Sequence, residues 1–138
     1  PEDVYDDPGS EFIAAFVGSV NILDGTVVDV ADGTCSFRSD EGIALKFAPK
    51  IAVAAGAHIR LMVRPERIRI GRTAGGEENA LPARVSFVEY FGTGIKYALD
   101  LAGGRQLTAQ AHNVGTDRLA VGEDAFALID SRHFSVLR

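Results

Sequence analysis

The residues that could ligate a metal ion are few and widely separated. The sequence contains three histidines, His58, His112 and His133, and a single cysteine, Cys35. Protein metal sites usually draw ligands from closely spaced pairs, such as two cysteines or two histidines within about five residues. Because no two of these residues have that spacing, the sequence predicts no metal site. Cys35 lies in a predicted strand and is expected to be buried as a small apolar side chain.

Motifs for phosphate binding or nucleophilic catalysis are also lacking. The nearest match to a phosphate-binding loop is Gly92-Thr93-Gly94-Ile95-Lys96, but its spacing differs from that motif and no helix is expected to follow it. A tight hairpin turn fits this stretch better. No Gly-x-Ser-x-Gly elbow is present to expose a nucleophilic serine. We therefore predict no catalytic residue and no cofactor-binding residue, and we do not expect this chain to be an enzyme.

A charged corner stands out between two short apolar segments. Arg64, Pro65 and Glu66 separate residues 59–63 from residues 68–70. Proline fixes its own φ and favours an extended conformation at Arg64, so the corner should end one strand and begin the next. In an extended chain Arg64 and Glu66 lie on one face and can form hydrogen bonds with neighbouring segments. The alternative is that both are ordinary surface charges.

Composition limits the classes of protein that fit. The chain has 138 residues, 46% of them hydrophobic, with 15 glycines and a net charge of −5. Many turns and few helical patterns favour β-structure. The acidic balance argues against binding nucleic acid or an anionic membrane. One cysteine permits no internal disulfide and fits a reducing, cytoplasmic setting. No apolar run approaches the roughly 20 residues needed to span a bilayer.

The N-terminal region predicts a short helix that needs a partner. After an acidic lead-in, Ser10 can cap a helix whose apolar stripe contains Phe12, Ile13, Phe16 and Val17. A helix this short is not stable alone, so its stripe should pack on other protein. The abrupt start at Pro1 is expected to be a cut inside a longer protein.

Beyond residue 21 the hydrophobic period is two, which predicts strands. Glycine-containing turns and polar segments separate them, and residues 73–79 form the most polar connection. The predicted strands cover residues 22–30, 34–37, 43–47, 59–63, 68–70, 83–90, 95–101, 105–111, 125–129 and 134–137.

The two halves of the chain resemble each other. Asn21-Ile22-Leu23 matches Asn79-Ala80-Leu81 at an offset of 58, and residues 53–56 match residues 119–122 at an offset of 66. This self-similarity predicts two copies of one small β unit. About five strands per copy suit a small barrel of the oligonucleotide/oligosaccharide-binding (OB) type. We predict a mainly β fold with tandem modules at residues 19–72 and 79–138, which can pack as one unit, preceded by residues 1–18 with the helix.

These motifs, taken in order, resemble a known family. Residues 1–8 and 12–18, followed by Asn21, Leu23 and Gly25, are similar to the junction in ATP-binding subunits of bacterial ABC importers, where the nucleotide-binding domain meets a C-terminal regulatory (TOBE-type) domain. Residues 63–68 resemble that family's arginine-proline-glutamate signature. Residues 88–92 with Tyr97, Gly104 and Leu107 resemble its second-module hairpin.

The resemblance implies a fragment that regulates and dimerises an importer ATPase. ATP and Mg²⁺ would bind to the upstream nucleotide-binding domain, so no cofactor is expected here. Residues 110–113 are most similar to the polyamine (spermidine/putrescine) group, although iron(III) and sugar importers share much of the pattern. The implied partners are a second copy, the chain's own nucleotide-binding domain and, through it, membrane permease subunits. The implied location is peripheral, on the cytoplasmic face of the bacterial inner membrane, without insertion and without nucleic acid.

The resemblance and the corner together identify candidate interface residues. An alternative function remains open, namely sensing of an oxyanion or a polyamine at an interface between barrels, because related domains of molybdate importers bind oxyanions in that way. The candidate regulatory or interface residues are Phe12, Phe16, Asn21, Arg64, Pro65, Glu66, Tyr90 and Gly92.

Overall fold

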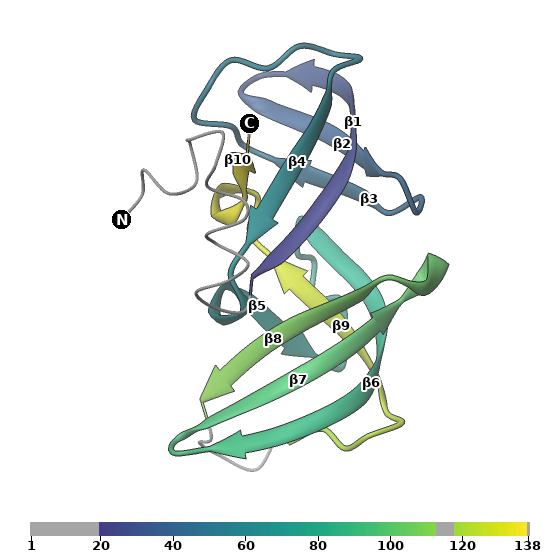
Figure 1. Ribbon diagram of the computed structural model, residues 1–138, viewed down its shortest axis with the longest axis vertical. Helices are drawn as coiled ribbons and strands as arrows, with labels where there is room; N and C mark the ends of the chain where they lie inside the picture. Colours follow the sequence, from purple (N-terminus) through teal and green to yellow (C-terminus); the bar gives the residue numbers. More distant parts are fainter. Residues whose placement is uncertain (1–19, 113–117, 138) are drawn as a thin grey trace.

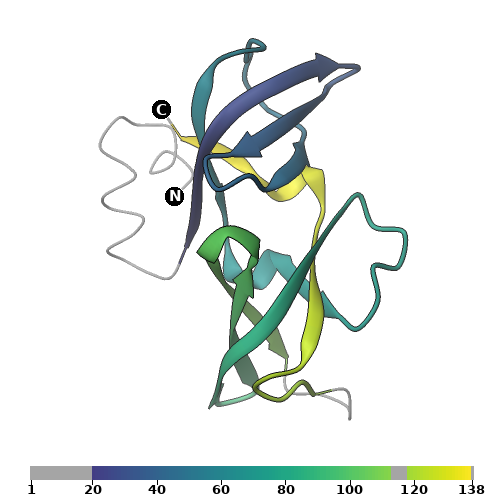
Figure 2. The ribbon, with the colours of Figure 1, turned by 90° about the vertical axis from the view of Figure 1, so that its right-hand side faces the viewer.

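The computed structural model describes residues 20–112 and 118–137, which form two five-stranded antiparallel sheets. The predicted helix, with Phe12 and Phe16, lies outside the described residues. Figure 1 shows the first sheet above the second, and the quarter turn in Figure 2 preserves this arrangement. The mainly β fold with curled, OB-like sheets confirms the predicted fold class.

All ten predicted strands are present. The first sheet has the order β10-β4-β1-β2-β3 and the second has the order β5-β9-β6-β7-β8. The bounds in the first sheet are β1 Asn21–Ala31, β2 Thr34–Ser39, β3 Ala44–Phe47, β4 His58–Val63 and β10 Ser135–Leu137. The bounds in the second sheet are β5 Ile68–Gly71, β6 Asn79–Phe91, β7 Gly94–Leu101, β8 Gln106–His112 and β9 Asp124–Ile129. Short 3₁₀ turns follow three of the strands: η2 Pro65–Arg67, η3 Ala102–Gly104 and η4 Ser131–His133.

Each sheet contains one strand from the other half of the chain. After η2, β5 leaves the first sheet and pairs with β9. After η4, β10 crosses in the opposite direction and pairs with β4. The two predicted modules therefore complete each other's sheets, which joins two units that are each too small to bury a large core. The segment connecting β5 and β6 loops out to the right in Figure 2, where the sequence predicts a polar connection.

The pairing registers of β1 and β6 support the internal repeat. The β1–β2 ladder shifts between Val27 and Asp29, and the β6–β7 ladder shifts between Val85 and Phe87. These two irregularities are 58 residues apart, which is the offset seen in the sequence. Val27 also exchanges backbone hydrogen bonds with the turn before β4, and Val85 does the same with the turn before β9. Both copies therefore share a bulge and the turn that packs against it.

The second copy has longer strands than the first. β6, β7 and β8 have 13, 8 and 7 residues, whereas β1, β2 and β3 have 11, 6 and 4. The extra residues that separate the two sequence offsets lie mainly in these strands. A two-residue turn closes the first hairpin, and Asp32 and Gly33 both have positive φ there (52° and 77°). This is the turn that a right-twisted hairpin requires.

The buried apolar side chains form one continuous cluster that reaches from sheet to sheet. Alternation along β1 places Leu23 and Val27 in this core while their neighbours face outward. Phe37 and Phe47 meet edge to face with ring centroids 6.2 Å apart, a favourable aromatic geometry. Cys35 is buried in β2, as predicted, and this burial raises the pKa of its thiol.

Candidate functional site

The Arg-Pro-Glu corner forms the η2 turn. Arg64 is extended (φ −77°, ψ 146°), as the following proline requires, and the Arg67 N–H donates to the Arg64 carbonyl at 3.0 Å. Pro65 is buried, whereas Arg64 and Glu66 are exposed. The turn packs against β8 of the second sheet. The bracing role assigned to Arg64 and Glu66 stays a prediction.

The η4 turn occupies the equivalent place in the second copy, 66 residues later. The carboxylate of Asp130 accepts from the Arg132 backbone N–H at 2.8 Å and from its guanidinium at 2.9 and 2.7 Å. These hydrogen bonds hold the pKa of Asp130 well below its usual range. The Ser131 carbonyl accepts from the Ala48 N–H at 3.0 Å, next to β3. Each turn thus packs against the edge strand of the opposite copy.

Asn21 begins β1 and is almost fully buried, with 4% of its surface exposed. Its amide donates to the Val63 carbonyl at 3.2 Å and to the Thr108 carbonyl at 2.8 Å. Its side-chain oxygen accepts from the Thr108 N–H at 2.7 Å. One carboxamide therefore satisfies both backbone groups of a residue on β8, the edge strand of the second sheet.

Asn79 repeats this arrangement from the second copy. It is 3% exposed, and its amide donates to the Ile129 carbonyl at 3.0 Å and to the Lys46 carbonyl at 2.8 Å. Its side-chain oxygen accepts from the Lys46 N–H at 2.7 Å. Lys46 lies on β3, the edge strand of the first sheet. The two asparagines thus cap reciprocal sheet edges and connect each sheet to the other.

A third connection joins the segment between β7 and β8, which contains η3 and Arg105, to the first sheet. The Arg105 guanidinium donates to the Ile22 carbonyl and lies 3.8 Å from the Glu41 carboxylate. Gly103 has a φ of +80°, and a Cβ at this position would lie 2.8 Å from the Glu41 carbonyl oxygen. Only glycine fits this approach without displacing the backbone.

The remaining predicted interface residues lie at the far end of the second sheet. Tyr90 is 54% exposed, and the Arg118 guanidinium lies 5.7 Å from the centre of its ring. Gly92 lies in the two-residue turn between β6 and β7 with a φ of 48°, which confirms the predicted hairpin turn. Tyr90 and Gly92 are therefore close to each other but belong to a different region from Asn21 and the η2 turn.

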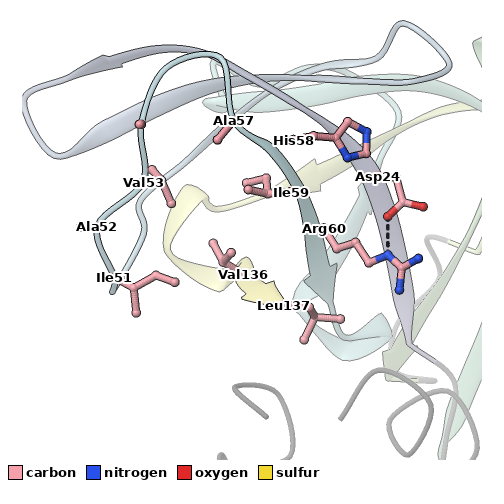
Figure 3. A pocket seen from close by; sticks show the side chains of 11 residues that line it. Asp24, Ile51, Ala52, Val53, Ala57, His58, Ile59, Arg60, Val136 and Leu137 are labelled. Atoms are coloured by element: carbon pink, nitrogen blue, oxygen red, sulfur yellow. Dashed lines mark hydrogen bonds and ion pairs between the residues drawn. The ribbon is translucent and has the colours of Figure 1, made fainter. Parts of the chain in front are cut away.

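A pocket of about 710 Å³ lies beside the first sheet (Figure 3). The loop from β3 to β4 forms one wall, and β4 and β10 form the other. On the polar side, Arg60 donates to Asp24 at 2.7 Å, and His58 lies 3.2 Å from the Asp40 carboxylate. The apolar lining consists of Ile51, Ala52, Val53, Ala54, Ala57, Ile59, Val136 and Leu137.

This pocket has the size and lining of a small-molecule site, with apolar walls and a few polar groups at the rim. Its lining comes from both predicted modules, because Val136 and Leu137 belong to residues 79–138 and the other lining residues belong to residues 19–72. A sensing site at an interface between barrels stays a prediction. In the second copy, residues 118–123 at the equivalent place are tied to β5 and its following segment, because Leu119 is buried and the Arg72 guanidinium donates to Glu123 at 2.5 Å and to the Arg118 carbonyl at 3.0 Å. The hydrogen bond from Arg72 and a second one from the Ala120 N–H lower the pKa of the Glu123 carboxyl. Ala52 and Ala57 stand at the equivalent positions of the first copy, 66 residues earlier than Arg118 and Glu123.

Among residues 20–112 and 118–137, no group of three histidine, cysteine or acidic side chains is arranged to hold a metal ion. Within the same ranges, no helix has the length and apolar character to cross a bilayer.

The structure brings together only part of the predicted set. Asn21 and Pro65 both contribute to the junction between the sheets, through the edge of β8 and the η2 turn. Sequence reasoning did not select Asn79, Thr108 or Lys46. Asn79 could have been found from the sequence, because it matches Asn21 in the repeat. Thr108 and Lys46 could not, because they take part through backbone groups that every residue type has.

Comparison with protein families gives a match to the TOBE domain over residues 61–137. Relatives of this chain include the spermidine/putrescine import ATP-binding protein PotA 1 of Pseudomonas aeruginosa, 34% identical over 99% of this chain and 36% of that protein. The protein PotA of Rubrobacter xylanophilus is also 34% identical, over 99% of this chain and 36% of its own length. The chain thus spans about a third of the length of these relatives.

Among solved structures, the chain is similar to the cytoplasmic molybdate-binding protein ModG with molybdate bound. The TM-score is 0.75 with 20% sequence identity, and the match covers 84% of this chain and 94% of that chain. At this identity the likeness shows that the fold is shared.

Proposed function

This chain belongs to the TOBE domain family, and on that basis we propose that it is the regulatory and dimerisation module of the ATP-binding subunit of an ABC importer. The observation that carries the proposal is the similarity to import ATP-binding proteins over 99% of the chain.

The interlocked sheets supply the rigidity that such a module needs. Reciprocal capping by Asn21 and Asn79, with exchange of β5 and β10, ties both halves into one body. A rigid body can hold two subunits together while their nucleotide-binding domains separate and close again. Because the domains then stay near each other, each re-association is an intramolecular event with a high effective concentration.

The proposal extends to the whole subunit. ATP and Mg²⁺ would bind in its nucleotide-binding domain, which would contact membrane permease subunits at the cytoplasmic face of the inner membrane. The transported substrate would be a polyamine, since the relatives are named for spermidine and putrescine import. Neither a cofactor nor the transported molecule is assigned to this module.

Self-association of the subunit tests the central part of the proposal. Sedimentation velocity would compare the complete subunit with the same subunit lacking residues 19–138, both without nucleotide. The complete subunit is expected to dimerise, and the truncated subunit is expected to remain monomeric. Equal association of the two proteins would contradict the proposal.

Uptake tests the substrate. Cells that lack the gene for the subunit are expected to lose uptake of radiolabelled spermidine or putrescine and to regain it when the gene is restored. Unchanged polyamine uptake, with loss of uptake of an iron(III) complex or a sugar, would contradict the polyamine assignment and leave the dimerisation role standing.

A second candidate function is the sensing of a small ligand. The pocket beside the first sheet favours it, because a pocket of about 710 Å³ that is lined by apolar side chains together with Asp24, His58 and Arg60 can hold a small polar-ended molecule. Calorimetry of the chain with spermidine, putrescine, molybdate, sulfate and citrate would test it. A micromolar ligand whose affinity falls in Arg60→Ala would support sensing at this pocket, and no heat from any of the five would count against it.

A further inference from the structure

The end of the second sheet exposes several large apolar side chains. Phe87 is 55% exposed, Tyr90 54%, Phe91 42% and Val121 63%. The Gly122 N–H donates to the Val85 carbonyl at 2.8 Å, so the turn containing Val121 lies beside β6 at Val85, two residues before Phe87. We call these four residues the hairpin tip. Because side chains alternate along a strand, Phe87 and Phe91 lie on one face of β6 and Tyr90 lies on the other. Exposed apolar side chains of this kind are typical of protein contact surfaces.

The first copy of the repeat serves as an internal control. The residue after the bulge is Phe87 in β6 but Asp29 in β1. The turn residue Val121 corresponds to Ala55, whereas Tyr90 and Phe91 belong to the extra length of β6, since the first-copy turn already begins at Asp32. The first copy forms a shorter hairpin with the same bulge, and it has Asp29 and Ala55 in place of Phe87 and Val121. The bulge and its turn therefore do not require apolar side chains at Phe87 and Val121.

The first copy also exposes Val28 and Val30, at 53% and 45%. Neither is aromatic, and no charged pair joins β1 and β2 beside them, because the facing residues are Ser36, Cys35 and Thr34. These valines therefore offer a matched comparison, since they are apolar and comparably exposed but lie on β1 of the first sheet.

The charges around the hairpin tip are of both signs, which suits contact with the same surface of a second copy. Glu89 and Lys96 are cross-strand partners, and the Lys96 ammonium lies 5.8 Å from the centre of the Phe91 ring. Arg84 and Asp124 form an exposed ion pair at 3.3 Å. In a two-fold interface the same patch meets itself, so each acid needs a base at its mirror position. A patch that contains both signs is compatible with this condition, whereas a strongly charged partner would favour a patch of one sign.

From these observations we infer that two copies of this chain pair through the hairpin tip. Phe87, Phe91 and Val121 form the apolar centre of the contact, and Glu89 and Lys96 form its polar rim. This inference rests on the proposed function, since it names the surface through which the module dimerises. Aromatic side chains at the centre of an interface usually carry most of the binding free energy.

Sedimentation equilibrium of the whole chain tests the inference with variants taken from its own repeat. The test variant is Phe87→Asp with Val121→Ala, which introduces the residues of the first copy. The control is Val28→Ser, which introduces the residue of the second copy, Ser86. Thermal unfolding midpoints close to that of the wild type would establish that both proteins are folded.

The test variant is expected to weaken dimerisation about tenfold or more, and the control is expected to leave it unchanged. If the test variant dimerises as tightly as the wild type, the hairpin tip is not the interface, while the dimerisation role still stands. If the control weakens dimerisation instead, the contact lies on β1 of the first sheet and the inference is overturned. A wild-type chain that stays monomeric at all concentrations also overturns it, and sedimentation of the complete subunit then decides the proposed function independently.

Discussion

Replacing Asn21 with alanine removes the cap on the edge strand β8 and leaves three backbone groups without their partner. These are the Val63 carbonyl and the N–H and carbonyl of Thr108. A buried polar group that loses its hydrogen-bond partner lowers the free energy of unfolding by about 1–3 kcal/mol. Thr108 is only partly buried, so water can replace some of its lost hydrogen bonds, and we use the lower value for each group. We therefore expect Asn21→Ala to lower the free energy of unfolding by about 3 kcal/mol.

The assay is thermal and urea unfolding followed by circular dichroism. For a chain of this size a loss of about 3 kcal/mol corresponds to a fall in the melting temperature of about 10 °C. The chain should still fold, because domains typically have about 5–15 kcal/mol of stability. Asn79→Ala is expected to cost a similar amount, since Asn79 makes the same three hydrogen bonds from the other copy.

A substitution of equal volume separates hydrogen bonding from packing. Asn21→Asp keeps the shape of the side chain but replaces its amide donor with an oxygen that faces the Val63 and Thr108 carbonyls. Its folded-state pKa should be raised above the ordinary value of about 3.9, so its destabilisation should be largest near neutral pH and should shrink as the pH falls towards 4. If Asn21→Ala changed the free energy of unfolding by less than about 0.5 kcal/mol, as a surface substitution such as Lys50→Ala should, the role of the Asn21 hydrogen bonds would be refuted.

Three further outcomes follow from individual contacts. The hydrogen bonds from Arg132 lower the folded-state pKa of Asp130, so their stabilisation is present above the unfolded-state pKa of about 4 and is lost as the pH falls further. The difference in urea midpoint between wild type and Arg132→Ala should therefore shrink on going from pH 6 to pH 3, and a constant difference would contradict this role of the Asp130–Arg132 hydrogen bonds. Gly25→Ala should lower the free energy of unfolding, measured with urea, by about 2 kcal/mol or more, because a Cβ there would lie 2.3 Å from the Arg38 carbonyl oxygen. Wild-type stability of this variant would show that the two strands do not approach so closely at Gly25. The Cys35 thiol, buried and raised in pKa, should react with a thiol reagent only as the chain unfolds, and labelling at the rate of free cysteine would contradict its burial.

Sequence patterns predicted the strands because each strand has one buried face. Alternation in β1 and the turn glycines at positions 33 and 92 were sufficient to place the hairpins. The exchange of β5 and β10 could not be read in the same way. A strand of three or four residues carries little register information, and its pairing partner is decided by where η2 and η4 direct the chain.

The candidate site was only partly predictable for a similar reason. Asn21 was selected from the family resemblance, and its role became physically clear only when Thr108 was seen opposite it. The partners of both asparagines are backbone groups, which any residue type can supply. The hairpin tip was partly visible, because Tyr90 was selected, but the exposure of Phe87 depends on the bulge that precedes it. A phenylalanine in a strand is more often buried, so the sequence alone gives no sign that Phe87 is exposed.

The most direct test of the central claim is the ATPase activity of the complete subunit measured against its concentration, with and without residues 19–138. Since two nucleotide-binding domains would have to meet for ATP hydrolysis, a module that keeps them together should shift half-maximal activity to a much lower subunit concentration. We predict that the complete subunit reaches half of its maximal activity at a concentration at least about tenfold lower than the truncated one. Superimposable curves for the two proteins would contradict the account.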